Sequence, residues 1–336
     1  MDKARRNFIS NVIKSLAAFG IGSTFLNNKL FANSKKKNNL KISLQCYSFA
    51  SEFFQGKFDL LNFSKTVRET YNLDGAEFWS IPFIGREKNK SFLNEIKQKS
   101  KDYGVDNTII LVDLFDAQTM KQGNSLASLD KKERIQAIED HKPWIDAANS
   151  IECKSIRINL WSDNGSPEEI MKVSIESILK LIEYSSNINI NIVIENHGGY
   201  TGDAKWLVNL IKKVNSKYLG SLPDFGDLNF CVKRDLSDTN ILSPKCLNQY
   251  DKYLGVKELL PFAKGISAKS TQFDSNGKET TTNFKKMLKL IKKSNFNGFI
   301  AIEYEGSIRD TFSQQKKHLS SHEGILATKK LLEKYI

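Results

Sequence analysis

The chain has 336 residues, enough for one large domain or two small ones without disulfide or metal support for the core. Hydrophobic residues make up 40% and charged residues 26%, which excludes a disordered or fibrous chain. The net charge of +12 would suit a nucleic-acid-binding protein. Residues 1–41, however, hold nine basic side chains and one acidic side chain, a net charge of +8. Residues 42–336 therefore carry a net charge of only +4. We therefore expect no nucleic-acid partner.

The first 33 residues have the pattern of a twin-arginine export signal. Arg5 and Arg6 precede a mostly apolar segment over residues 8–26. The alternative is a membrane anchor, but Lys14 interrupts the apolar run, which is shorter than the ~20 clean residues that a span needs. We expect export to the periplasm and no stable membrane span after removal of the signal. An uncleaved signal would instead leave a membrane tether.

After a Lys/Asn-rich linker over residues 34–40, strand patterns and amphipathic helix patterns alternate to the end of the chain. The predicted strands are Lys41–Tyr47, Gly75–Trp79, Asn107–Val112, Ser155–Leu160, Asn189–Glu195, Gly220–Pro223, Gly265–Lys269 and Gly298–Glu303. The predicted helices are Phe63–Thr70, Phe92–Tyr103, Lys131–Asn149, Pro167–Ser186, Ala204–Val214, Lys257–Ala263, Asn283–Lys293 and His322–Tyr335. Strict alternation of strands and helices predicts parallel strands joined by right-handed crossovers.

Eight strand–helix units over residues 41–336 predict an α/β fold of the (β/α)8 TIM barrel type. The alternative is a doubly wound open sheet, which would place a glycine-rich phosphate loop after the first strand. The segment Cys46-Tyr47-Ser48-Phe49 is not such a loop. Three long irregular stretches each follow a predicted strand, and we expect them on the face where barrel enzymes keep their sites. These stretches are residues 114–129, 225–254 and 271–282.

The four cysteines show neither a CxxC pair nor a metal-ligand spacing with histidine. Cys46 and Cys153 lie in or beside apolar segments, and we expect both to be buried thiols. In an oxidising compartment, Cys231 and Cys246 could form a disulfide bridge; the alternative is that both are free thiols.

Acidic residues stand at the ends of three of the last four predicted strands. Glu195 ends the fifth strand, Asp224 follows the sixth, and Glu303 ends the eighth. The carboxyl ends of barrel strands meet at one face, where three carboxylates would be costly to bury without a partner. Oxygen ligands at this position suit a divalent cation such as Mg²⁺ or Mn²⁺. The alternative is a set of unrelated carboxylates that pair with Lys269 and Arg157.

Three C-terminal stretches add a resemblance to a known family. They read LGSLPDFGDLNF, DKYLGVKELLPFAKGISAKSTQFDSNGKET and GFIAIEYEG. Together with the strand-end acids, they resemble an exported bacterial branch of the xylose isomerase-like barrel superfamily, which is also called the sugar phosphate isomerase/epimerase family. The resemblance covers about residues 41–336.

The resemblance implies a single divalent metal held by Glu, Asp, His and Glu on the last four strands. The matching positions here are Glu195, Asp224, Ser267 and Glu303, so Ser267 departs from the family pattern. His197 lies two residues beyond Glu195 on the same strand face, and we expect it or water to replace the missing histidine. Carboxylates then dominate the ligand set, which favours Mn²⁺ or Mg²⁺ over the alternatives Zn²⁺ and Co²⁺.

In the relatives, the ligands that match Glu195 and Glu303 also transfer a proton, and the resemblance implies the same catalytic roles here. The expected enzyme is a metal-dependent isomerase or epimerase that removes a proton next to a carbonyl group of a free or modified sugar, through an enediolate. Alternatives are a lyase or dehydratase acting on a keto-sugar or keto-glycoside, and a non-catalytic carbohydrate-binding barrel. The candidate substrate-binding residues are Lys269, Asn159, Arg157, Tyr47 and Ser267.

Overall fold

The computed structural model describes residues 39–336 except 117–118, 120, 163, 236 and 239–243. The predicted signal, residues 1–33, and nearly all of the predicted linker lie outside the described residues. Among the described residues, no helix combines the length and the apolar character that a bilayer crossing requires.

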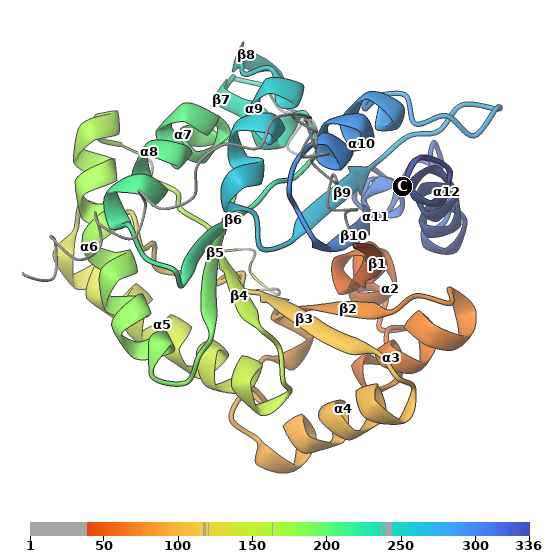
Figure 1. The fold of residues 1–336 in the computed structure, drawn as a ribbon, viewed down its shortest axis with the longest axis horizontal. Coiled ribbons are helices and arrows are strands. Elements are labelled where there is room, and N and C mark those ends of the chain that lie inside the picture. The colour runs from red at the N-terminus through yellow and green to blue at the C-terminus, as the bar shows by residue number, and fades with distance from the viewer. Residues whose placement is uncertain (1–38, 117–118, 120, 163, 236, 239–243) are drawn as a thin grey trace, which may run out of the picture. The chain divides into compact units, whose positions relative to one another are not determined.

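Eight parallel strands curve around a common centre, and helices cover the outside (Figure 1). Their order in the sheet is β6-β5-β4-β3-β2-β1-β10-β9. The strands are β1 (Leu40–Gln45), β2 (Gly75–Trp79), β3 (Asp106–Leu111), β4 (Ser155–Ile158), β5 (Asn191–Glu195), β6 (Leu219–Leu222), β9 (Ile266–Ser270) and β10 (Gly298–Tyr304).

The barrel closes between the chain that leaves β6 and β9. Asp224 and Ser267 form a parallel bridge. The Ser267 N–H donates to the Pro223 carbonyl at 2.9 Å, and the Ser267 carbonyl accepts from the Phe225 N–H at 3.2 Å. The predicted (β/α)8 barrel is therefore confirmed, and the closing seam runs directly beside Asp224.

Most crossover helices agree closely with the sequence prediction, because they begin at a capping side chain. The helix predicted over Lys257–Ala263 is an exception: it begins at Lys252, after the capping side chain of Asp251, and ends at Leu259. Ser166 and Ser320 each form a capping box with the glutamate three residues later. The main helices are α4 (Lys90–Asp102), α5 (Lys131–Ser150), α6 (Pro167–Ser186), α8 (Ala204–Val214), α9 (Lys252–Leu259), α10 (Phe284–Lys293) and α12 (Ser321–Tyr335). The first predicted helix, Phe63–Thr70, is present as an α-helical turn (Phe63–Lys65) that continues into a π-helical turn (Thr66–Thr70), and a 3-10 turn (Leu60–Asn62) precedes it.

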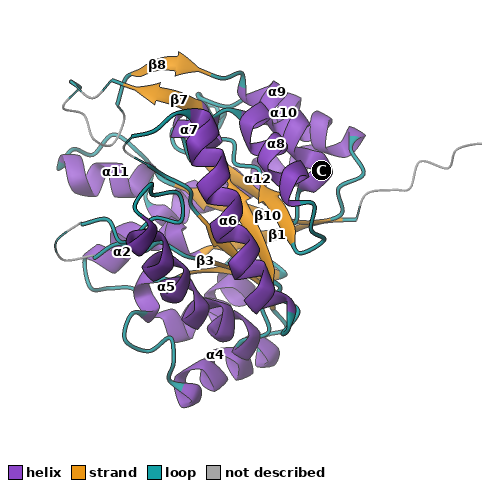
Figure 2. Cartoon of the chain, turned by 90° about the vertical axis from the view of Figure 1, so that its left-hand side faces the viewer, coloured by secondary structure: helices purple, strands orange, loops and turns teal. Residues whose placement is uncertain are grey.

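Additional short elements follow the strands on the face where the strands end. They are α2 (Ala50–Phe54) after β1, α7 (Gly199–Gly202) after β5 and α11 (Gly306–Ser313) after β10. The stretch 225–254, expected to be irregular, contains the antiparallel hairpin β7 (Cys231–Arg234) and β8 (Cys246–Gln249), which lies beside α7 (Figure 2). Strands of four residues are too short to show a clear alternation in the sequence.

A disulfide joins the two strands of this hairpin. Cys231 and Cys246 are bonded, with their Cα atoms 5.7 Å apart, so the bridge that the sequence left open is present. Cys46 and Cys153 are free and buried, which confirms the expectation for both thiols.

Candidate functional site

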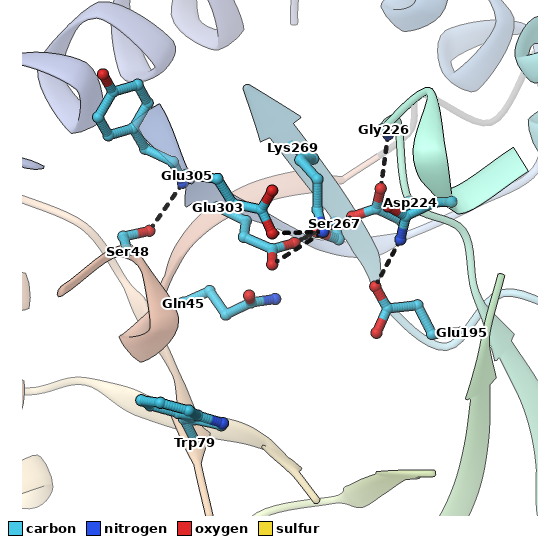
Figure 3. Close-up of polar contacts among 12 residues, drawn as sticks. Gln45, Ser48, Trp79, Glu195, Asp224, Gly226, Ser267, Lys269, Glu303 and Glu305 are labelled. Carbon is cyan, nitrogen blue, oxygen red and sulfur yellow. Dashed lines mark hydrogen bonds and ion pairs between the residues drawn. The ribbon is translucent and has the colours of Figure 1, made fainter. Parts of the chain in front are cut away.

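Three buried carboxylates meet at the carboxyl ends of β5, β6 and β10 (Figure 3). Glu195, Asp224 and Glu303 each offer one oxygen, and these oxygens lie within 4.8 Å of one another. None of the three residues is more than 5% exposed. Burial is the main cause that raises their pKa values, to about 7 for Glu195, about 6 for Asp224 and about 8 for Glu303. Without a bound cation, the centre therefore exchanges protons near neutral pH. We call these three residues the carboxylate centre.

A tight turn after β6 fixes Asp224. The Gly226 N–H donates to Asp224 Oδ1 at 2.6 Å, and Asn196 pairs with the Asp224 backbone through both atoms of its amide group. A Cβ atom at Gly226 would lie 2.9 Å from Asp224 Oδ1, so the turn requires glycine. Asp224 Oδ2 is buried and has no hydrogen-bond partner; Lys269 Nζ lies 3.7 Å from it.

Two side chains orient Glu195. Asn229 donates to Glu195 Oε1 at 3.2 Å, and Arg157 Nε forms an ion pair with Oε2 at 2.9 Å. Arg157 is itself held by Asp113, 2.5 Å from the other end of the guanidinium group. Asp113 also accepts hydrogen bonds from Trp79 Nε1 and Asn159 Nδ2, both at 2.9 Å. Arg157 thus forms ion pairs with Asp113 and Glu195 at the same time, and Asp113 orients it toward Glu195.

The sequence reasoning missed Asp113 and Asn229. Asp113 is the second residue after β3, just as Asp224 is the second residue after β6. This shared position could have identified Asp113 as a residue of the barrel mouth. Asn229 lies in the loop between Asp224 and the disulfide-linked hairpin, and only the folded path of that loop brings it to Glu195.

Ser267 and Lys269 contact Glu303 from β9. Ser267 Oγ donates to Glu303 Oε2 at 2.5 Å, so this serine acts as a hydrogen-bond donor to a carboxylate at the position where the resemblance implies a histidine. Lys269 Nζ lies 3.3 Å from Glu303 Oε1 and 3.0 Å from Glu305 Oε1. Burial alone would lower the pKa of Lys269, but the surrounding carboxylates raise it well above its ordinary value. Lys269 therefore stays protonated and positively charged.

His197 lies outside the carboxylate centre. Its side chain is exposed, and its backbone N–H donates to Thr201 Oγ1 at 2.9 Å. Among the described residues, the group that could hold a metal ion contains the three carboxylates and no histidine. The assignment of His197 as a replacement ligand stays a prediction, and the geometry gives it no support.

Aromatic side chains form the other side of the barrel mouth. Tyr47 packs edge-on against Trp79, with ring centroids 4.9 Å apart, and Phe53 packs against the same indole at 5.4 Å. Figure 3 shows Gln45 and Trp79 across the mouth from Asp224 and Glu195. A polar, charged half and an aromatic half together suit a small molecule that has both oxygen atoms and an apolar face, as a sugar does.

The carboxylate centre fits a divalent cation. Three oxygen donors from different strands converge, and the buried Asp224 Oδ2 lacks a hydrogen-bond partner. Oxygen donors of this kind suit Mg²⁺ and Mn²⁺. The protein itself supplies two positive groups to these carboxylates: Lys269 beside Asp224 and Glu303, and Arg157 beside Glu195.

Comparisons with known proteins agree with this geometry. A family model described as xylose isomerase-like TIM barrel matches residues 31–330. A search of curated proteins found no match to this sequence.

Several solved structures share the fold over nearly their whole length. A D-psicose 3-epimerase crystallised in the presence of D-fructose has a TM-score of 0.65 at 12% identity, covering 88% of this chain and 99% of that one. The IolI protein with a bound zinc atom has a TM-score of 0.62 at 12% identity, covering 88% and 99%. The 3-keto-D-glucoside 4-epimerase YcjR from E. coli has a TM-score of 0.58 at 11% identity, covering 88% and 100%. At these identities the likeness shows the fold alone.

Proposed function

Since the chain belongs to the xylose isomerase-like TIM barrel family, we propose that it is a metal-dependent sugar isomerase or epimerase. It would move a proton next to a carbonyl group of a free or modified sugar. The observation that carries this proposal is the convergence of Glu195, Asp224 and Glu303 within 4.8 Å at the barrel mouth. Solved structures of the same fold include a D-psicose 3-epimerase and a 3-keto-D-glucoside 4-epimerase, which supports a sugar as the substrate.

Glu195, Asp224 and Glu303 would hold the divalent cation, with Mn²⁺ or Mg²⁺ favoured by the carboxylate donors. When bound, the cation would polarise the substrate carbonyl group and stabilise an enediolate. Glu195 and Glu303 stand on either side of Asp224 and Ser267 in the ring of strands, so they can face two sides of one bound sugar. One carboxylate would take the proton and the other would return it.

The contacts of these two glutamates suit that role. Arg157 and Asn229 hold the Glu195 carboxylate, while Ser267 and Lys269 hold that of Glu303. Burial raises both pKa values to the neutral range, to about 7 and about 8, where a carboxyl group can accept and return a proton with little cost. Lys269 is also placed to donate to a negatively charged oxygen of the reacting sugar.

The proposal predicts metal binding and proton exchange together. The purified chain should bind about one Mn²⁺ and should catalyse deuterium incorporation from heavy water next to the carbonyl group of a ketohexose or keto-glycoside, which NMR would follow. Analysis of the products would separate epimerisation from elimination.

Two variants serve as controls for this experiment. Glu195→Gln should lose both the metal and the exchange. Glu333→Gln should keep both, because Glu333 is an exposed residue near the end of α12 and pairs with Lys329. An absence of bound metal at millimolar Mn²⁺ together with an absence of exchange would contradict the proposal and favour a carbohydrate-binding barrel.

The proposal includes export by the twin-arginine route. Its support is the Arg5-Arg6 pair before an apolar segment, and the Cys231–Cys246 disulfide, which is typical of an oxidising compartment. The intact mass of the chain recovered from the periplasm should lack about the first 33 residues. Recovery of the full-length mass from the cytoplasm would contradict export.

A further inference from the structure

Lys269 occupies the charged half of the barrel mouth. Its side chain comes from β9 and is only 7% exposed. The ammonium nitrogen lies 3.7 Å from Asp224 Oδ2, 3.3 Å from Glu303 Oε1 and 3.0 Å from Glu305 Oε1 (Figure 3). One lysine thus contacts two buried carboxylates and the partly exposed carboxylate of Glu305.

Two of these three partners belong to the carboxylate centre. Asp224 and Glu303 are also the residues whose oxygens converge as ligands for a cation. A divalent cation among these oxygens would come close to the ammonium group, and two cations at such a distance repel strongly in a buried site. The lysine and the cation therefore cannot both keep their contacts with Asp224 and Glu303.

Glu305 gives Lys269 an alternative partner. It is the nearest of the three carboxylates and does not belong to the carboxylate centre. Glu305 follows β10, and Arg309 holds its second oxygen at 3.5 Å. The lysine stem packs directly against Gly226, where a Cβ atom would lie only 2.8 Å from Lys269 Cδ, so this glycine makes space for the side chain.

We propose that Lys269 is a built-in competitor of the divalent cation. In the metal-free protein its ammonium group neutralises Asp224 and Glu303 as well as Glu305; when the cation binds, the ammonium group gives up the first two contacts and keeps the contact with Glu305. The inference rests on the proposed function in so far as the carboxylate centre is a metal site. It predicts that the metal affinity of the protein is set by Lys269 and Glu305, although neither is a ligand.

The test is a measurement of Mn²⁺ affinity on the full-length protein, by calorimetry and by the electron paramagnetic resonance signal of free Mn²⁺. Lys269→Met removes the competing charge and should tighten Mn²⁺ binding by about tenfold or more. Glu305→Gln leaves Lys269 without its alternative partner and should weaken binding about threefold to tenfold. The two variants thus shift the affinity in opposite directions.

Lys252→Met is the matched control. Lys252 is also a buried lysine in an ion pair, 2.5 Å from Asp227, and it donates to Thr282 Oγ1 at 2.8 Å. Removing it changes the net charge by the same amount at a place outside the carboxylate centre. The Mn²⁺ affinity of this variant should stay within about twofold of the wild type.

Lys269→Met leaves buried carboxylates without their cation, so its thermal unfolding should be followed with and without Mn²⁺. Glu305→Gln retains Lys269 and gives the second, independent measurement if the first variant fails to fold. Equal Mn²⁺ affinity in the wild type and both variants would overturn this inference alone. An absence of Mn²⁺ binding in every protein, Lys269→Met included, would overturn the proposed metal site as well, whereas binding only in Lys269→Met would support a strong competitor.

Discussion

Replacing Glu303 by glutamine is expected to lower the rate of deuterium exchange by about 10³-fold, the range seen when a general acid or base is removed. Glutamine has the size of glutamate and still offers an oxygen to Ser267 Oγ, 2.5 Å from the native carboxylate. It can neither take up a proton nor supply a negative ligand oxygen. Exchange measured by NMR, together with the Mn²⁺ content, would show this loss.

Glu77→Gln is the matched control for Glu303→Gln. Glu77 is fully buried in the same barrel, and burial raises its pKa to about 8, the same value as that of Glu303, but Glu77 is not part of the carboxylate centre. Its contact is Gln45, whose Nε2 lies 3.4 Å from Glu77 Oε2. We expect Glu77→Gln to keep exchange within about threefold of the wild type. Equal rates for the two variants would remove Glu303 from the catalytic machinery.

The barrel and its acidic strand ends could be predicted from the sequence because both depend on local signals. The period of apolar residues identifies each strand and helix, and the position directly after a buried strand identifies the mouth. Glu195 and Glu303 are strand-terminal residues, and Asp224 follows the end of β6 by two residues. The alternation of strands with helices then brings these positions to one face.

The contacts among these residues could not be predicted in the same way, because they depend on the path of the loops. Lys269 has three carboxylates within 4 Å, and the sequence gives no order of preference among them. Asn229 reaches Glu195 from a loop that continues into the disulfide-linked hairpin. His197 has a suitable sequence position, two residues beyond Glu195, but it is not part of the group of converging ligand atoms among the described residues.

Replacing Arg157 by methionine is expected to destabilise the fold by about 3–5 kcal/mol at pH 9, because it leaves the buried Glu195 and the partly exposed Asp113 without their cation. The loss should be smaller at pH 6. The pKa of Glu195 is raised by burial to about 7 even beside Arg157 and would rise further without it. A carboxyl group whose pKa is raised in the folded state favours folding at low pH and loses that contribution as the pH rises.

Urea unfolding at pH 6 and pH 9 would measure this difference between Arg157→Met and the wild type. Arg134→Met is the matched control, since Arg134 is also buried but donates to the carbonyl oxygens of Ser128 and Leu129 and pairs with the half-exposed Glu176 at 3.6 Å. The free energy of unfolding that Arg134→Met loses should be the same at the two pH values.

Adding Glu195→Gln to Arg157→Met should restore part of the stability at pH 9, because the second change removes one of the unpaired charges. A loss that is the same at both pH values, with no recovery in the double variant, would mean that Arg157 acts by packing alone and that Glu195 does not depend on it for its charge.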